Sequence, residues 1–211
     1  MTTSPAFARP GFTSRVVPVI VITDVSQAVA LAHALLEGGI DVMEITLRHP
    51  AGLPAIEAIA RAVPRMHVGA GTVRQASDIA RVAAAGAQFA LSPGISDDLV
   101  QAAIDARLPF VPGVMTPSEV LCAQSHGFSL VKLFPAEQAG GLGMVKALAG
   151  PFADMQLCPT GGVSADNMQA YLRQPNVAMV GGSWLTPADA LLSGDWARIT
   201  QLATQAVALA A

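Results

Sequence analysis

The chain has 211 residues, enough for one large domain or two small ones with a substantial apolar core. Its composition, 52% hydrophobic and 13% charged, excludes an intrinsically disordered protein. The formal net charge of -3 offers no basic face for nucleic acid or for an anionic membrane. No apolar run approaches the roughly 18 residues that span a bilayer, and residues 1–11 lack the apolar core of a signal peptide. We therefore expect a cytoplasmic protein with no nucleic-acid or membrane partner.

The predicted elements alternate between strand and helix along the chain. Short apolar runs predict strands at residues 16–22, 40–47, 67–72, 88–92, 109–113, 130–134, 156–160 and 177–180. Helical periodicity predicts helices at residues 25–37, 53–63, 75–85, 97–106, 144–149, 167–172, 187–192 and 196–209, with a further helix that begins at Thr116. Two of these helices begin with a predicted capping box, Thr116 with Glu119 and Asp24 with Gln27.

Eight strands alternating with helices, with no linker between them, predict an α/β fold with a parallel sheet. The count of eight favours a single-domain (β/α)8 TIM barrel over residues 1–211, with residues 1–15 as an N-terminal extension or helix. A doubly wound sheet is the alternative that periodicity alone leaves open. In a barrel the chemistry collects at the C-terminal ends of the strands, so these positions hold the candidate site residues.

The strand at 130–134 carries a lysine, Lys132, in the middle of an apolar run. The chain has only two lysines, Lys132 and Lys146, against ten arginines, so arginine fills its ordinary basic positions. Lysine is rarely buried, and unlike arginine it can lose a proton and attack a carbonyl group. Lys132 is therefore either an ion-paired core residue or a nucleophile.

The strand at 40–47 places a carboxylate in a second apolar segment. Side chains alternate along a strand, so Glu44, Thr46 and Arg48 share one face. We expect Glu44 to lie near Lys132 and to transfer protons, and Arg48 to hold an anion. A purely structural salt bridge is the competing interpretation.

The last two predicted strands end in paired glycines, Gly161-Gly162 and Gly181-Gly182, and Ser183 follows the second pair. Exposed backbone N–H groups at such positions bind phosphate, and a serine hydroxyl can contribute. Two tight turns would explain the same glycines. A phosphorylated keto acid would suit such a site, which combines a buried amine, a carboxylate, an arginine and a phosphate-binding turn.

Two further strand ends hold weaker candidates, Thr72 after the third strand and Pro93 after the fourth. The two cysteines, Cys122 and Cys158, are interpreted as reduced thiols. No group of His, Cys, Asp and Glu has the sequence spacing of metal ligands, so we expect no metal and no cofactor.

Six motifs occur in a characteristic order: Val-Met-Glu-Ile-Thr-Leu-Arg, Val-Gly-Ala-Gly-Thr-Val, Gln-Phe-Ala-Leu-Ser-Pro-Gly, Val-Lys-Leu-Phe-Pro-Ala-Glu, Cys-Pro-Thr-Gly-Gly-Val-Ser and Gly-Gly-Ser-Trp-Leu. From about Val16 onward the chain resembles the family of 2-keto-3-deoxy-6-phosphogluconate (KDPG) aldolase, also described as 4-hydroxy-2-oxoglutarate (KHG) aldolase. The resemblance implies a class I, Schiff-base aldolase on a (β/α)8 barrel, usually a homotrimer. Such an enzyme makes pyruvate and glyceraldehyde 3-phosphate in the Entner–Doudoroff pathway.

The resemblance also implies roles for individual residues. Lys132 matches the Schiff-base lysine and Glu44 the proton-transferring glutamate. Arg48 and Thr72 match positions that contact the pyruvate end of the substrate. The remaining substrate-binding candidates are the pocket-lining Phe134, Pro93, and Gly161, Gly162 and Ser183 at the phosphate end.

Other functions fit part of this pattern. An aldolase for the galactonate isomer would share Lys132 and Glu44, because only the stereochemistry at C4 differs. A phosphosugar isomerase or epimerase would use the two residues for proton transfer without a covalent imine. A non-catalytic phosphometabolite-binding protein would leave Lys132 without a purpose.

Two stretches depart from the family pattern, residues 49–52 and residues 140–144. We expect both stretches to flank the site.

Overall fold

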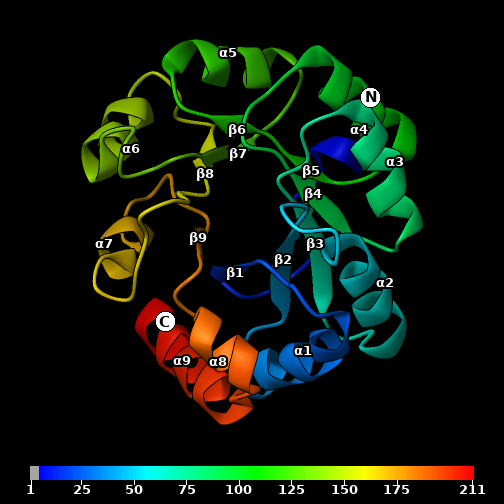
Figure 1. Ribbon diagram of the computed structural model, residues 1–211. Helices are drawn as coiled ribbons and strands as arrows, with labels where there is room; N and C mark the ends of the chain where they lie inside the picture. Colours follow the sequence, from blue (N-terminus) through cyan, green and yellow to red (C-terminus); the bar gives the residue numbers. More distant parts are fainter. Residues whose placement is uncertain (1–4) are drawn as a thin grey trace.

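The computed structural model describes residues 5–211 as parallel strands surrounded by helices (Figure 1). The strands are β1 (Val16–Ile20), β2 (Val42–Thr46), β3 (His67–Gly71), β4 (Phe89–Leu91), β5 (Phe110–Val111), β6 (Gly113–Val114), β7 (Leu130–Leu133), β8 (Gln156–Leu157) and β9 (Val180–Gly182). The α-helices are α1 (Ala28–Glu37), α2 (Gly52–Ala62), α3 (Ala76–Ala84), α4 (Asp97–Ala106), α5 (Pro117–Ser125), α6 (Gly141–Ala149), α7 (Met168–Leu172), α8 (Ala188–Ser193) and α9 (Trp196–Ala210). Two short 3-10 helices, η1 (Pro5–Phe7) and η2 (Val25–Gln27), complete the described elements. Among residues 5–211, no helix combines the length and apolar character that crossing a membrane requires.

The strands form two parallel sheets. Six strands pair in the order β5-β4-β3-β2-β1-β9 and curl into about half of a barrel, and three pair in the order β6-β7-β8. The two sheets meet at Pro112, which lies between β5 and β6, has no N–H to donate, and accepts a hydrogen bond from the N–H of Lys132 on β7. On the other side, single bridges join Leu157 to Val177 and Thr160 to Gly181.

The strands are buried on both faces because helices cover the outer face and the sheets enclose the inner one. β1, β2 and β7 are buried at every position. Most of their residues are apolar, and each such side chain gains free energy when it leaves water. Glu44 and Lys132 are the charged residues within these three strands, so they are the positions that burial does not explain.

Most predicted elements are confirmed, and the errors have local causes. The helix at 97–106 has the predicted ends, and the Thr116–Glu119 capping box is formed. The Asp24–Gln27 box is wrong: the carboxylate of Asp24 accepts a hydrogen bond from Ser26 N, and residues 25–27 form a 3-10 turn.

Two other predicted boundaries are shifted. The last strand lies at Val180–Gly182 rather than at 177–180, because its ladder runs along β1 from Val16 onward. Helix α6 begins at Gly141 rather than at residue 144. Gly140 and Gly141 have φ values of 109° and 57°, a left-handed geometry that glycine adopts without strain.

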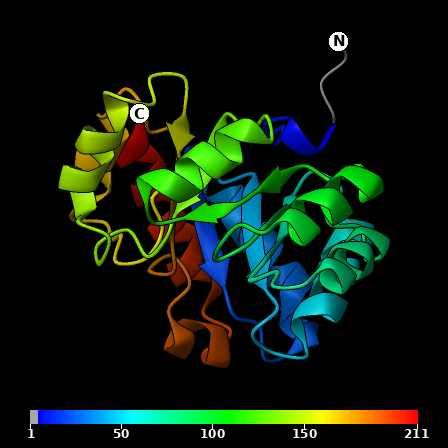
Figure 2. The same ribbon diagram turned by 90° about the horizontal axis from the view of Figure 1, so that it is seen from above.

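The segment before β1 is fastened to the fold. Residues 1–4 of the predicted 1–15 extension lie outside the described part of the chain, and η1 lies beside α4 (Figures 1 and 2). The ring of Phe7 packs edge-on against Phe128, with ring centroids 4.9 Å apart. Asp41 accepts hydrogen bonds from Thr13 and Ser14. Burial acts to raise the pKa of Asp41, but these hydrogen bonds outweigh it and hold the pKa below its ordinary value.

The capping box of α5 gives a test of the local structure. We expect Thr116→Ala to lower the free energy of unfolding by about 1 kcal/mol, because the N–H of Glu119 loses its acceptor. Ser118→Ala, on the exposed face of the same helix, is the matched control and should change it by less than about 0.5 kcal/mol. Urea denaturation of the three proteins measures both values, and equal losses in the two variants would contradict this account.

Candidate active site

A buried ion pair connects the two sheets. Lys132 on β7 places its Nζ atom 2.9 Å from Oε1 and 3.2 Å from Oε2 of Glu44 on β2. The two residues are 4% and 1% exposed, so neither charge is solvated by bulk water. Two buried charges are tolerated only when they are paired, which accounts for the contact between residues 88 positions apart. The structure therefore brings together the two residues that the sequence singled out.

The surroundings of the pair are tightly packed. A Cβ atom at Gly71 on β3 would lie 2.0 Å from Oε1 of Glu44, so the carboxylate needs glycine there. The ring of Phe134 is centred 5.5 Å from Nζ of Lys132, within the range of a cation–π contact. Burial raises the pKa of the Cys158 thiol to about 11, although the charge of Lys132 opposes the shift. Cys158 therefore remains a neutral thiol beside the amine.

A cavity of about 580 Å³ holds most of the predicted substrate-binding residues. They line it together with two buried threonines that the sequence analysis did not single out, Thr160 and Thr186. The predicted residues on its wall are Arg48, Phe134, Gly161, Gly162 and Ser183. Phe134 links this cavity to the ion pair, because it both lines the wall and lies close to Nζ of Lys132.

Backbone conformation or close packing requires glycine at three positions on this wall. Gly161 and Gly162 have φ values of 97° and 81°, where side chains are strained. A Cβ atom at Gly182 would lie 1.8 Å from the ring of Trp184. Within the described chain, the N–H groups of Gly162 and Ser183 donate to no other protein group. These features make the wall a place where an anion can approach the backbone.

Arg48 and Thr72 meet at the edge of this cavity. The Nε atom of Arg48 donates to Oγ1 of Thr72 at 3.2 Å. Thr72 also lines an adjacent cavity of about 320 Å³, together with His49 and Pro50 from the departing stretch 49–52. Its φ of 59° is unusual, because a β-branched residue rarely adopts the left-handed conformation. Such strain concentrates at functional sites.

Pro93 is not part of either cavity. It is exposed and lines a separate hollow with Val73, Gly94 and Leu99. Its backbone packs against β6, because a Cβ atom at Gly113 would lie 2.3 Å from the carbonyl carbon of Pro93. The structure thus places Pro93 outside both cavities, with a packing contact to β6.

A network of side chains that the sequence pattern did not reveal holds the Gly161-Gly162 turn. Glu137 accepts a short hydrogen bond from the hydroxyl of Tyr171, and Nδ2 of Asn167 donates to the carbonyl of Gly162 at 3.0 Å and to Glu137 at 3.4 Å. Burial, reinforced by the hydrogen bond and charge of Glu137, raises the pKa of Tyr171. The available signal was the position of Glu137, four residues after the end of the Lys132 strand.

The fold and the site are those of an enzyme of the parallel α/β class, with a buried lysine–glutamate pair near a cavity at the strand ends. Residues 12–202 match a family described as KDPG and KHG aldolase. A 2-dehydro-3-deoxy-phosphogluconate aldolase from Pseudoalteromonas atlantica is 52% identical over 196 residues, which cover 93% of this chain and 91% of that protein. A KHG/KDPG aldolase from Escherichia coli is 48% identical over 195 residues, which cover 92% of each. The chain belongs to the KDPG and KHG aldolase family.

Solved structures agree with this assignment. The crystal structure of KDPG aldolase from Legionella pneumophila, with pyruvate captured at low pH as a covalent carbinolamine intermediate, has a TM-score of 0.90 and 43% sequence identity to this chain. The match covers 92% of this chain and 94% of that one. The family resemblance of the six sequence motifs is therefore confirmed.

The buried ion pair predicts a large and partner-dependent effect on stability. We expect Lys132→Met to lower the free energy of unfolding by about 3–5 kcal/mol, because it leaves the Glu44 carboxylate buried without a cation. Adding Glu44→Gln to this variant should recover much of the loss. Lys146→Met, at the exposed second lysine, is the control and should change stability by less than about 0.5 kcal/mol. Chemical denaturation of the unmodified chain and the three variants would contradict the expectation if the double variant were less stable than Lys132→Met.

Proposed function

We propose that the chain is a class I aldolase that cleaves 2-dehydro-3-deoxy-6-phosphogluconate to pyruvate and glyceraldehyde 3-phosphate. The observation that carries the proposal is the buried Lys132 amine, held 2.9 Å from the Glu44 carboxylate and close to the ring of Phe134, which lines the neighbouring cavity. The names of the two curated relatives support the substrate, and the pyruvate carbinolamine of the Legionella enzyme supports the covalent route. We propose 4-hydroxy-2-oxoglutarate, cleaved to pyruvate and glyoxylate, as a second substrate.

In the proposed mechanism Lys132 is the nucleophile. Its ammonium group gives up a proton, for which Glu44 is the nearest acceptor, and the neutral Nζ attacks the C2 ketone. Glu44 returns this proton to the hydroxyl of the carbinolamine, which leaves as water and gives an iminium ion, so Glu44 is again a carboxylate. Glu44 removes the C4 hydroxyl proton, the C3–C4 bond breaks, and its electrons pass into the iminium to give an enamine. The aldehyde leaves, the enamine is protonated at C3, and water releases pyruvate and the free amine.

The proposed orientation places the two ends of the substrate at opposite sides of the cavity wall. Arg48, joined to Thr72, is suited to the carboxylate end because its guanidinium carries a permanent charge. The N–H groups at Gly162 and Ser183, with Gly161 shaping the turn, are suited to the phosphate end. Phe134 and, from outside the cavity, Pro93 complete the proposed set.

Three further proposals concern the architecture. We propose that the two sheets form one complete (β/α)8 barrel, since β5 and β6 are consecutive and bridges link β8 to the segment before β9 and Thr160 to β9. We also propose that residues 1–211 are a single domain and that the chain assembles as a homotrimer. The trimer rests on the family resemblance alone.

Trapping the imine tests the proposed function. Borohydride reduction in the presence of pyruvate should leave a stable adduct on Lys132, located by intact mass and peptide mapping, because reduction converts the imine to a secondary amine. The adduct should persist in Lys146→Ala and be absent in Lys132→Ala. If neither pyruvate nor the phosphorylated substrate gave an adduct, the aldolase mechanism would be excluded and a proton-transferring isomerase would take its place.

The network behind the glycine turn predicts an effect that depends on the phosphate. We expect Glu137→Gln to raise KM for the phosphorylated substrate about tenfold, because it weakens the contacts from Tyr171 and Asn167 that hold Gly162. KM for unphosphorylated 4-hydroxy-2-oxoglutarate should stay unchanged. Steady-state kinetics with both substrates measures the difference, with Glu37→Gln at an exposed position as the control. An equal rise for both substrates would show a general loss of structure instead.

A further inference from the structure

Three side chains with metal-binding atoms meet on the outer surface, away from both cavities. Asp97, Cys122 and His126 place one ligand atom each so that all three atoms lie within 4.8 Å of one another. Within residues 5–211, no other three His, Cys, Asp or Glu side chains gather in this way. None of the three lines the cavities of about 580 and 320 Å³ or has a role in the proposed mechanism.

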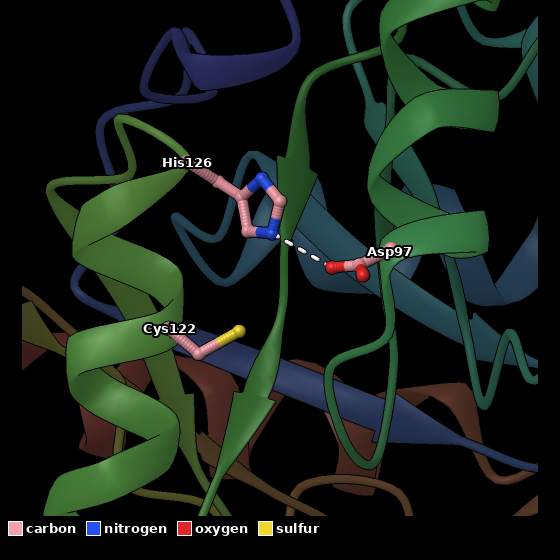
Figure 3. Close-up of side chains that lie close together, drawn as sticks. All are labelled: Asp97, Cys122 and His126. Atoms are coloured by element: carbon pink, nitrogen blue, oxygen red, sulfur yellow. Dashed lines mark hydrogen bonds and ion pairs between the residues drawn. The ribbon is translucent and has the colours of Figure 1, made fainter.

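The positions of the three residues on their helices explain why their side chains lie close together. Cys122 lies on α5 and His126 is its C-cap residue four positions later, so both side chains project from one face of the helix (Figure 3). Asp97 is the first residue of α4 and faces them from the neighbouring helix. The spacing of Cys122 and His126 was visible in the sequence, but the third residue lies 25 positions upstream of Cys122 and only the fold brings it near.

The side chains have room to adopt metal geometry. Nε2 of His126 lies 2.9 Å from Oδ1 of Asp97, and ligand atoms in a tetrahedral zinc site are roughly 3.3–3.6 Å apart. The contact must therefore open by a few tenths of an ångström. The Asp97 side chain is 86% exposed and that of His126 31% exposed, so neither is locked by packing.

We propose that Asp97, Cys122 and His126 bind a zinc ion that links α4 to α5. A thiolate, an imidazole and a carboxylate form a donor set suited to zinc, with the fourth tetrahedral position left to water. Binding deprotonates the Cys122 thiol and replaces the His126–Asp97 hydrogen bond with two bonds to the metal. Because only the folded chain brings the three ligands together, zinc stabilises it, and the stabilisation rises with the logarithm of the free zinc concentration once that exceeds Kd. This role is independent of the proposed catalysis.

Cobalt substitution tests the thiolate ligand directly. One equivalent of Co²⁺ should produce a thiolate-to-cobalt absorption band, and one equivalent of Zn²⁺ should abolish it. The band should be lost in Cys122→Ser and retained in Cys158→Ala, since the second cysteine is buried beside Lys132. A band of equal intensity in Cys122→Ser, or no band in the unmodified chain, would overturn the proposal.

Zinc affinity, measured by competition with a chromophoric chelator, tests the other two ligands. His126→Gln and Asp97→Asn should each weaken binding at least tenfold, whereas His33→Gln and Asp98→Asn, at exposed positions, should not. Asp97 and Asp98 both lie in the first turn of α4, so their comparison decides the question even if a substitution on α5 impairs folding. Equal affinity in Asp97→Asn and Asp98→Asn would show that zinc binds only to scattered surface donors and would overturn the site.

Discussion

Lys132 and Glu44 are each stable in the interior only in the presence of the other. A buried ammonium or carboxylate carries a desolvation penalty that an opposite charge at hydrogen-bond distance largely offsets. The contact also joins β7 of one sheet to β2 of the other. The residues around the ion pair fit this contact. Gly71 leaves space for the carboxylate, and Phe134 places an aromatic ring close to the amine. The same pair therefore connects the sheets and supplies the reactive groups of the proposed chemistry.

The glycine side of the neighbouring cavity presents backbone rather than charged side chains. Gly161 and Gly162 adopt left-handed conformations, and Gly182 makes room for the Trp184 ring. Such a surface is shaped by what supports it from behind, since glycine has no side chain of its own to hold it in place. Glu137, Tyr171 and Asn167 provide that support through hydrogen bonds. The shape of this wall thus depends on residues that do not line the cavity.

Local signals in the sequence were reliable where a few neighbouring residues decide the structure. The ends of α4 and the Thr116–Glu119 capping box depend on contacts within one helical turn, and both were predicted. The Asp24–Gln27 box failed because Ser26 offered the carboxylate of Asp24 a nearer N–H. The final strand was misplaced because its position depends on pairing with β1, which lies more than 150 residues earlier in the chain.

The sequence by itself determined the alternation of strands and helices, the family, and the two charged residues that an apolar strand does not explain. Each of these follows from composition, period or order of motifs along the chain. Tertiary structure alone decided that Glu44 contacts Lys132, that Pro93 lies outside the cavity, and that Asp97 reaches Cys122 and His126. These contacts join residues 25 or more positions apart or depend on which side of a loop faces the cavity. Their distances are set by how the sheets and helices pack, and no local pattern carries that information.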